Sequence, residues 1–178
     1  MSRAWVALGA NLGDRQATLR AALRRLADLP GLSVEAVSSL YESAAELPPG
    51  ALPAPPFLNA VARIATALAP RALLWHLLRI EAGLGRRREA GAIGRTVDLD
   101  LLAAGDSVIH EPDLILPHPR LAARAFVRQP LLEIDPGWRH PATGRPLSPP
   151  GRESADGCRC VAAWTGVDWR RSGGEEAS

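Results

Sequence analysis

The stretch Arg95-Thr-Val-Asp98-Leu-Asp100-Leu-Leu (residues 95–102) has the alternating pattern of a strand that is buried on one face. Successive strand side chains point to opposite faces, so Asp98 and Asp100 emerge together. Leu99 and Leu101 then pack on the opposite face. Two neighbouring carboxylates repel each other, and hard divalent cations prefer carboxylate oxygen. The pair is therefore a candidate magnesium site, with the solvated acidic face of an edge strand as the alternative.

Outward from this strand, strand and helix signals alternate in the order β-α-β-β-α-β. Asp14 is a candidate N-cap of the first helix, which Pro30-Gly31 ends, and Pro70 opens the second helix. The other expected strands cover residues 5–8, 32–41 and 57–66, and a short last helix covers residues 126–134. This order is the ferredoxin-like pattern of an α+β fold, and it predicts an antiparallel sheet covered by helices.

Two loops flank the expected sheet. Residues 43–56 are rich in proline and can form neither a helix nor a strand ladder, so they predict a long loop that is either an active-site cover or a plain excursion. Residues 83–95 form a basic, glycine-punctuated loop that leads into the acidic strand. A charge run is usually only solvated, but here the adjoining acids favour an anion and its metal bridging the two signs.

Three further side chains are candidates for chemistry. Phe57 and Asn59 share one strand face directly after the proline-rich loop, although Phe57 could equally be a core residue and Asn59 could bind a backbone group. His118 lies between two prolines that fix its local backbone. A lone histidine is more often structural than catalytic, so this reading stays open as well.

Composition excludes several functional classes. The chain has 178 residues, the size of one ordinary domain, and a formal net charge of +2. All 21 residues counted as lysine or arginine are arginine, which rules out a P-loop lysine and a Schiff-base lysine. Phosphate chemistry would therefore depend on arginine forks and metal. The near-neutral charge and the lack of a repeated basic and aromatic pattern argue against nucleic-acid binding.

The number of cysteines and the hydropathy of the sequence indicate the cellular compartment of the protein. Cys158 and Cys160 are the only cysteines, too few for a disulfide framework or a zinc set, and a reduced cytoplasmic compartment follows as the expectation. No apolar run approaches the about 20 residues needed to span a bilayer, and no signal peptide is recognised, so no membrane partner is expected. We expect residues 1–147 to form one domain and residues 148–178 a poorly structured tail.

Taken together, these sequence features resemble those of the 6-hydroxymethyl-7,8-dihydropterin pyrophosphokinase family of folate biosynthesis. The resemblance runs from about residue 6 to residue 136 and rests on several segments in the correct order. These segments are Ala7-Leu-Gly9-Ala-Asn11-Leu-Gly13-Asp14, Phe57-Leu-Asn59-Ala-Val61, Ile80-Glu81 with Gly85-Arg86-Arg-Arg88, Gly94-Arg95-Thr-Val-Asp98-Leu-Asp100, and Leu116-Pro-His118-Pro119 with Arg124-Ala-Phe126-Val.

The resemblance implies an ATP-dependent pyrophosphokinase that transfers a diphosphoryl unit to the hydroxymethyl oxygen of a reduced pterin and releases AMP. It implies that Asp98 and Asp100 bind two magnesium ions and that the loops around the site are mobile covers. The implied catalytic residues are Arg86, Arg95, Asp98 and Asp100. The implied pterin contacts are Ser43, Ala44, Phe57, Asn59 and Phe126. The implied ATP contacts are Glu81, Arg86, Arg88, Arg95, Leu101, His118 and Arg124.

Two other readings compete with this one. A pterin- or nucleotide-binding relative would keep affinity but have lost or weakened transfer. A generic magnesium-dependent phosphohydrolase using Asp-x-Asp would release phosphate without pterin. The paired aromatic and amide side chains at Phe57 and Asn59 argue against the hydrolase. The expected partners are thus ATP and a reduced pterin, bound by a monomer.

Overall fold

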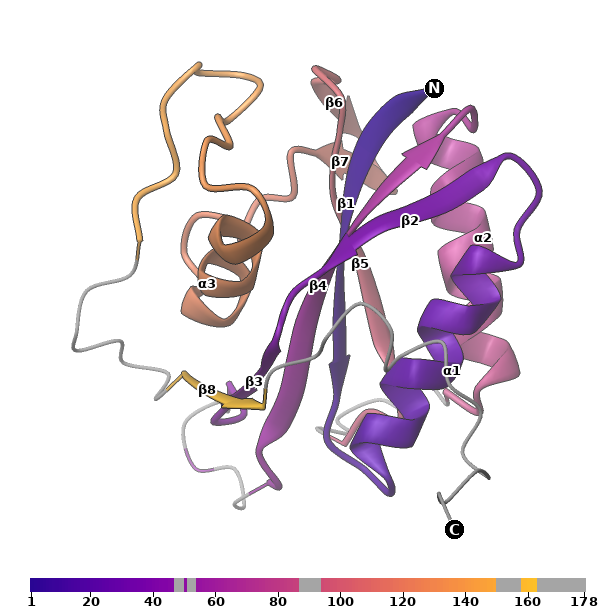
Figure 1. The fold of residues 1–178 in the computed structure, drawn as a ribbon, viewed down its shortest axis with the longest axis vertical. Coiled ribbons are helices and arrows are strands. Elements are labelled where there is room, and N and C mark those ends of the chain that lie inside the picture. The colour runs from indigo at the N-terminus through magenta and orange to yellow at the C-terminus, as the bar shows by residue number, and fades with distance from the viewer. Residues whose placement is uncertain (47–49, 51–53, 87–93, 150–157, 163–178) are drawn as a thin grey trace, which may run out of the picture.

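The computed structural model describes residues 1–46, 50, 54–86, 94–149 and 158–162. Its main element is a six-stranded sheet in which strands run in the order β5-β1-β4-β3-β8, with β2 also paired to β4. Every strand pairing in this sheet is antiparallel, which confirms the expected α+β fold (Figure 1). Its strands are β1 (Ser2–Ala10), β2 (Leu32–Val37), β3 (Leu40–Ser43), β4 (Phe57–Thr66), β5 (Asp98–Ala104) and β8 (Arg159–Ala162).

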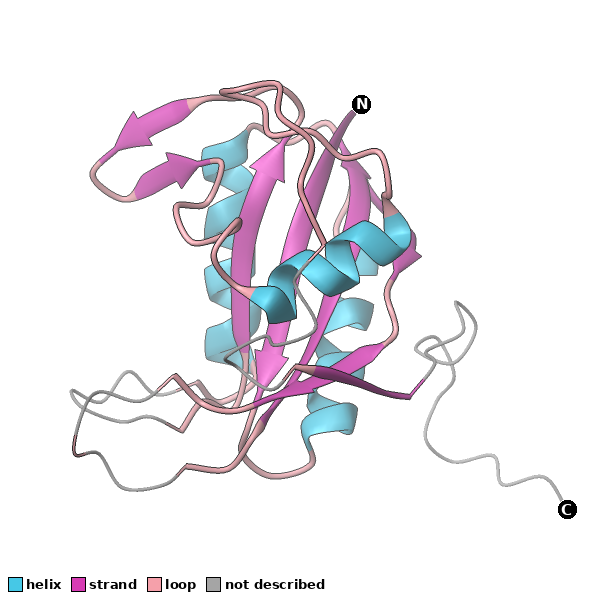
Figure 2. Ribbon diagram, turned by 90° about the vertical axis from the view of Figure 1, so that its left-hand side faces the viewer, coloured by secondary structure: helices cyan, strands magenta, loops and turns pink. Residues whose placement is uncertain are grey.

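Helices cover both faces of the sheet. The helices α1 (Arg15–Ala27) and α2 (Pro70–Gly83) pack on one face, and α3 (Ala125–Ile134) crosses the other, as Figure 2 shows. The first core joins the leucines of α1 and α2 to the sheet, including Leu99 and Leu101 of β5. A second, smaller core joins α3 to Trp5, Val61 and Trp138. None of the described helices is both long and apolar enough to cross a bilayer.

The helix starts follow the sequence signals. Asp14 is the N-cap of α1, and its carboxylate accepts a hydrogen bond from Ala17 N–H at 2.9 Å. This bond satisfies one of the free donors of the first turn. Pro70 is the first residue of α2, where its missing N–H costs nothing. Both helices therefore begin where the sequence predicts.

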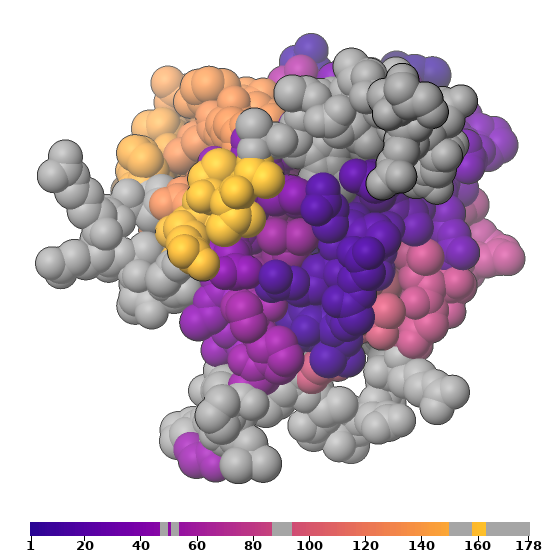
Figure 3. Space-filling model, turned by 60° about the horizontal axis from the view of Figure 1, so that its bottom comes forward, coloured from indigo at the N-terminus to yellow at the C-terminus, as the bar shows by residue number. Residues whose placement is uncertain are grey.

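Three elements differ from the expectation. The single strand predicted over residues 32–41 is divided into β2 and β3 at Ser38 and Ser39, where Ser38 Oγ accepts a hydrogen bond from Val61 N–H and Ser39 N–H donates to the Glu133 carboxylate. A hairpin of β6 (Ile109–Glu111) and β7 (Leu114–Leu116) was not predicted. In the stretch expected to be a poorly structured tail, β8 pairs with β3. Figure 3 shows β8 in yellow at the surface, next to the orange segment that contains α3.

Candidate active site

A cavity of about 250 Å³ opens between the sheet and the first turn of α3. Its floor is the sheet face that α3 covers, and Arg120 and Arg124 come from the segment that leads into α3. The residues that line it are Ala7, Leu8, Gly9, Ser43, Ala44, Glu46, Phe57, Asn59, Arg95, Asp98, Asp100, Arg120, Arg124, Phe126 and Val127.

A row of paired residues across four strands explains the shape of this floor. Gly9 of β1 pairs with Asp98 on one side and with Asn59 on the other, and Asn59 pairs in turn with Tyr41. Because side chains of paired residues lie on the same face, a hydrogen atom stands where a side chain would otherwise separate Asp98 from Asn59. A Cβ built at Gly9 would lie 3.3 Å from Asn59 Oδ1. The glycine therefore keeps the floor open between an acidic side and an amide side.

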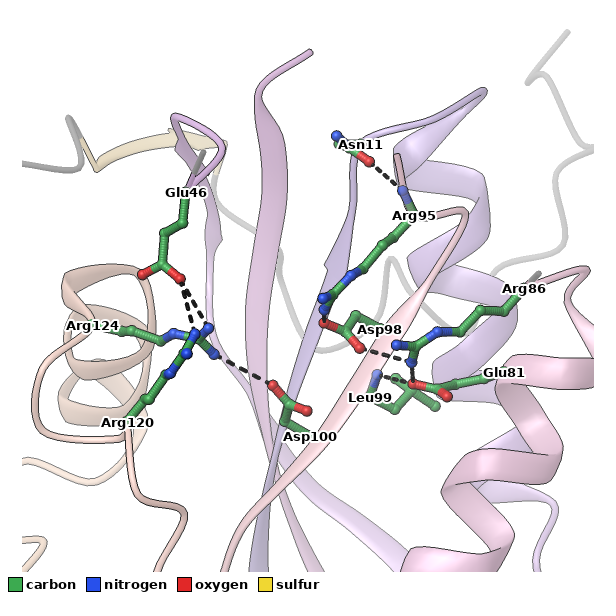
Figure 4. Close-up of polar contacts among 10 residues, drawn as sticks. All are labelled: Asn11, Glu46, Glu81, Arg86, Arg95, Asp98, Leu99, Asp100, Arg120 and Arg124. Carbon is green, nitrogen blue, oxygen red and sulfur yellow. Dashed lines mark hydrogen bonds and ion pairs between the residues drawn. The ribbon is translucent and has the colours of Figure 1, made fainter. Parts of the chain in front are cut away.

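Asp98 occupies the acidic side with two arginine partners. Arg86 Nη1 lies 2.7 Å from Asp98 Oδ1, and Arg95 Nη1 contacts Asp98 Oδ2 (Figure 4). Arg86 comes from just beyond the end of α2, and Arg95 comes from the segment before β5. The sequence thus brings one arginine from each side of the basic loop to the first carboxylate of the strand.

Asp100 lies on the same face, two residues further along β5. Arg124 Nη1 is 3.6 Å from Asp100 Oδ2. Burial and the neighbouring charge of Asp98 raise the pKa of Asp100, against the opposing effects of His118, Arg124 and Arg95. The sequence prediction that the two carboxylates share one strand face is confirmed by their common place on the cavity wall.

Glu81 supports this wall from behind. Its side chain is only 2% exposed, and its Oε1 accepts a hydrogen bond from Leu99 N–H at 2.7 Å and contacts Arg86. Burial is the largest effect on the pKa of Glu81 and raises it. Glu81 therefore joins the end of α2 to the residue between the two aspartates, and it does not line the cavity itself.

The amide side of the cavity is built from β3, β4 and α3. Asn59 is 5% exposed, and its Nδ2 donates hydrogen bonds to Ser43 Oγ at 3.0 Å and to Tyr41 O at 3.2 Å. These bonds fix the orientation of the amide relative to Gly9. Phe57 and Phe126 contribute aromatic rings from β4 and α3 to the same cavity.

Arginines and one glutamate form the remaining wall. Arg124 Nη2 donates a hydrogen bond to Glu46 Oε2 at 2.9 Å, and Arg120 Nη1 lies 3.7 Å from the same oxygen. The guanidinium of Arg124 also lies 5.3 Å from the centre of the Phe126 ring. Arg124 therefore forms ion pairs with Glu46 and Asp100 and a cation–π contact with the Phe126 ring.

Most of the residues suggested by the sequence meet at this cavity, but Arg86, Glu81, Leu101 and His118 do not line it, although Arg86 contacts Asp98. Leu101 is 4% exposed and packs in the first core, on the opposite face of β5. His118 does not line the cavity either; its Nδ1 accepts a hydrogen bond from Arg120 N–H at 3.2 Å, and burial lowers its pKa. Arg88 lies outside the described residues.

Sequence reasoning did not assign Gly9, Glu46 or Arg120 to the site. Arg120 precedes Arg124 by four residues, a spacing that places two side chains on one side of a turn. Gly9 carried a signal too, since a glycine inside a strand often marks a close approach. Glu46 carried none, because only the fold brings it to Arg124.

The carboxylate pair fits a magnesium ion only if other oxygens complete the site. In the described part of the chain, no group of three or more His, Cys, Asp and Glu side chains is arranged to hold a metal ion. Mg²⁺, however, is usually held by one or two carboxylates with water and substrate phosphates. A cation beside Asp98 and Asp100 would also favour the charged form of Asp100, whose pKa burial raises. The donor set therefore fits Mg²⁺ bound together with a polyphosphate.

Comparison with known proteins places this site in a family. The model of the family described as 7,8-dihydro-6-hydroxymethylpterin-pyrophosphokinase matches residues 5–136. A 2-amino-4-hydroxy-6-hydroxymethyldihydropteridine pyrophosphokinase of Synechocystis sp. is 36% identical over 159 residues, which cover 89% of this chain and 77% of that protein. A protein of the same name from Methylorubrum extorquens is 43% identical over 137 residues, covering 76% and 84%.

A solved structure shows the same fold at low identity. Plasmodium falciparum HPPK-DHPS superimposes with a TM-score of 0.64 at 15% identity, covering 82% of this chain. The chain spans 44% of that longer protein, so this likeness concerns the fold alone. The family match covers the sheet except β8 and the start of β1, all three described helices and every described wall of the cavity. This chain therefore belongs to the 7,8-dihydro-6-hydroxymethylpterin-pyrophosphokinase family.

Proposed function

We propose that this chain transfers the diphosphoryl unit of ATP to the hydroxymethyl oxygen of 6-hydroxymethyl-7,8-dihydropterin, giving the pterin diphosphate and AMP in folate biosynthesis. The observation that carries the proposal is one cavity with two functional sides. Asp98 and Asp100 stand on one side, and Asn59 stands on the other, separated by the bare backbone of Gly9. Family membership supports the same reaction.

The amide side binds the pterin. A flat ring stacks on aromatic faces, and Phe57 and Phe126 both line the cavity. Asn59, held by Ser43 Oγ, presents a fixed amide that selects a donor and acceptor pattern on the ring edge. Ser43 and Ala44 at the end of β3 complete this side.

The acidic side holds ATP. Arg86, Arg95 and Arg124 are the guanidinium groups for phosphate oxygens, since each already lies within ion-pair distance of an aspartate of β5. Asp98 and Asp100 would hold Mg²⁺, which neutralises triphosphate charge and orients the reacting phosphorus when bound. Two ions is the number that the family resemblance implies. The resemblance adds Arg88 to this set; Glu81, His118 and Leu101, which it also implied, do not line the cavity.

Transfer needs positioning more than strong acid–base chemistry. The hydroxymethyl oxygen attacks the β-phosphorus, the bond from that phosphorus to the α-phosphate oxygen breaks, and AMP leaves with the electron pair. The hydroxymethyl proton is released to solvent. Arg86 and Arg95 stabilise charge that develops on the transferred and leaving oxygens. The cavity walls hold the oxygen and phosphorus in one place, which is the larger part of the rate enhancement.

A coupled assay for AMP tests the proposal. Purified protein is incubated with ATP and Mg²⁺, with and without 6-hydroxymethyl-7,8-dihydropterin, and AMP and inorganic phosphate are followed separately. We expect AMP only in the presence of the pterin. Binding of both substrates without AMP would instead identify a relative that has lost transfer, and phosphate release without pterin would identify a hydrolase.

The setting of this reaction is part of the proposal. Residues 1–147 form the catalytic domain, and residues 148–178, which add β8 to the edge of its sheet, follow it. The enzyme acts as a monomer in the cytoplasm, where ATP is available. Light scattering on the purified chain measures its oligomeric state.

A further inference from the structure

Asn11, which follows the last residue of β1, joins two segments that border the cavity from opposite sides. Its side chain is 2% exposed. Its Nδ2 donates a hydrogen bond to Pro55 O at 3.1 Å, and its Oδ1 accepts one from Arg95 N–H at 2.6 Å. The two partners fix the orientation of the amide, because a carbonyl needs a donor and an N–H needs an acceptor.

Each partner leads directly into one half of the site. Pro55 lies two residues before Phe57, the start of β4 on the pterin side. Arg95 contacts Asp98 and lies three residues before it. The backbone adds a second bond on this side, since Asn11 N–H donates to Arg95 O at 3.1 Å. One buried amide thus connects the entry to the aromatic strand with the entry to the acidic strand.

Asparagine is the residue type that this connection requires. A carboxylate in its place could accept from Arg95 N–H but could not donate to Pro55 O, and a shorter side chain would reach neither. Leu12, the residue after Asn11, also packs against the acidic side. A Cβ at Gly94 would lie only 2.8 Å from Leu12 Cδ1. The turn at residues 11–12 therefore packs closely against residues 94–95.

We propose that Asn11 is a positioning residue that couples pterin binding to nucleotide binding. A pterin that orders the Pro55 carbonyl beside Phe57 favours the Asn11 orientation that holds Arg95 in place for phosphate, and the nucleotide acts in the reverse direction by linkage. Asn11 does not line the cavity. The inference rests on the proposed function, because it concerns the two substrates of that reaction.

The test compares two variants that loosen the same segment. Asn11→Asp removes the donor to Pro55 O and keeps the acceptor for Arg95 N–H. Arg15→Met removes different bonds, from Arg15 Nη1 to Pro56 O at 2.8 Å and to Glu42 Oε2 at 3.0 Å, neither of which involves Arg95. Calorimetry gives the Kd of 6-hydroxymethyl-7,8-dihydropterin with and without a non-hydrolysable ATP analogue and Mg²⁺. The coupling factor is the Kd without the analogue divided by the Kd with it.

We expect the wild-type coupling factor to exceed one. One neutral hydrogen bond contributes roughly 0.5–1.5 kcal/mol, so Asn11→Asp should reduce this factor by about 2- to 13-fold. Arg15→Met should weaken pterin binding but leave the coupling factor unchanged. A thermal unfolding curve for each variant verifies that the binding data describe folded protein, and Asn11→Ser, which loses both side-chain bonds, repeats the test if Asn11→Asp does not fold.

Three results would overturn the inference. A wild-type factor of one removes the coupling itself. An unchanged factor in Asn11→Asp removes Asn11 from it, even if both substrates then bind more weakly. An equal reduction in Arg15→Met would show that any loosening of this segment has the same effect. A wild-type protein that binds neither substrate refutes the proposed function as well, which separates that failure from the other three.

Discussion

Gly9→Ala places one methyl group on the floor of the cavity, where the distances to its neighbours determine the effect on pterin binding. The new Cβ would lie 3.3 Å from Asn59 Oδ1, 3.7 Å from Phe57 Cδ1 and 4.0 Å from Asp98 Cβ. Asn59 cannot move away freely, because its amide donates to Ser43 Oγ and to Tyr41 O. The methyl group therefore protrudes into the space between the amide side and the acidic side.

The size of the effect follows from overpacking. Extra methyl groups in close-packed surroundings cost about 1–3 kcal/mol, which corresponds to roughly a 5- to 150-fold loss of affinity if the cost falls on the bound pterin. We expect the Kd and KM for the pterin to rise by this amount. The KM for ATP should change by less than about twofold, since Arg86 and Arg95, the proposed phosphate ligands, contact Asp98 and not Gly9 or Asn59.

Steady-state kinetics with each substrate varied in turn, together with pterin calorimetry, measures the effect. The control is Gly137→Ala, because no heavy atom lies within 4 Å of the corresponding Cβ and Gly137 has no positive φ. An unchanged pterin KM in Gly9→Ala would refute the reasoning, as would an equal rise in both KM values. A matching loss in the control variant would attribute the effect to the substitution type.

Three further predictions test other parts of the site and fold. Asp100→Ala should lower kcat about 100-fold or more at saturating Mg²⁺ while pterin affinity and the unfolding temperature stay near wild type; full activity would remove Asp100 from the metal site. Glu81→Gln keeps an acceptor for Leu99 N–H but weakens the charge-assisted contact with Arg86, so the KM for ATP should rise about fivefold, and an unchanged KM would contradict that role. Deleting residues 148–178 removes β8 and should lower the unfolding temperature in calorimetry by only about 2–4 °C, since surface pairing contributes about 1 kcal/mol; loss of cooperative unfolding would contradict the proposed domain boundary. The deletion also removes Arg159, whose hydrogen bond lowers the pKa of Glu42 more than that of Arg15 does. The pKa of Glu42 should therefore rise in carboxyl NMR titrations. The stability that ionised Glu42 contributes above its unfolded-state pKa should decrease.

Local patterns in the sequence were sufficient for much of the fold. Period-two alternation placed Asp98 and Asp100 on one face, and the predicted strand over residues 57–66 matches β4. Asp14 and Pro70 marked helix starts because capping depends on a few adjacent residues. Each of these features is decided within one or two turns of chain.

What the sequence could not predict depends on distant pairing. The strand over residues 32–41 is divided at Ser38 and Ser39, whose contacts with Val61 and Glu133 no local pattern encodes. The bond from Leu99 N–H to Glu81 and the contact of Glu46 with Arg124 join residues far apart in the chain. β8 pairs with β3 across more than half of the sequence. Such pairs follow only from the assembled sheet, and they decide how the site is supported.

Nucleotide binding at this site must exchange partners. Arg86 and Arg95 are paired with Asp98, and Arg124 is paired with Glu46 and Asp100. A triphosphate would compete with the carboxylates for these guanidinium groups, while Mg²⁺ would compete with the guanidinium groups for the same aspartates. The net free energy of binding is therefore the difference between two sets of charge pairs. Replacing one arginine removes a phosphate contact but also frees an aspartate for the cation, so nucleotide affinity falls by less than the strength of the lost contact alone.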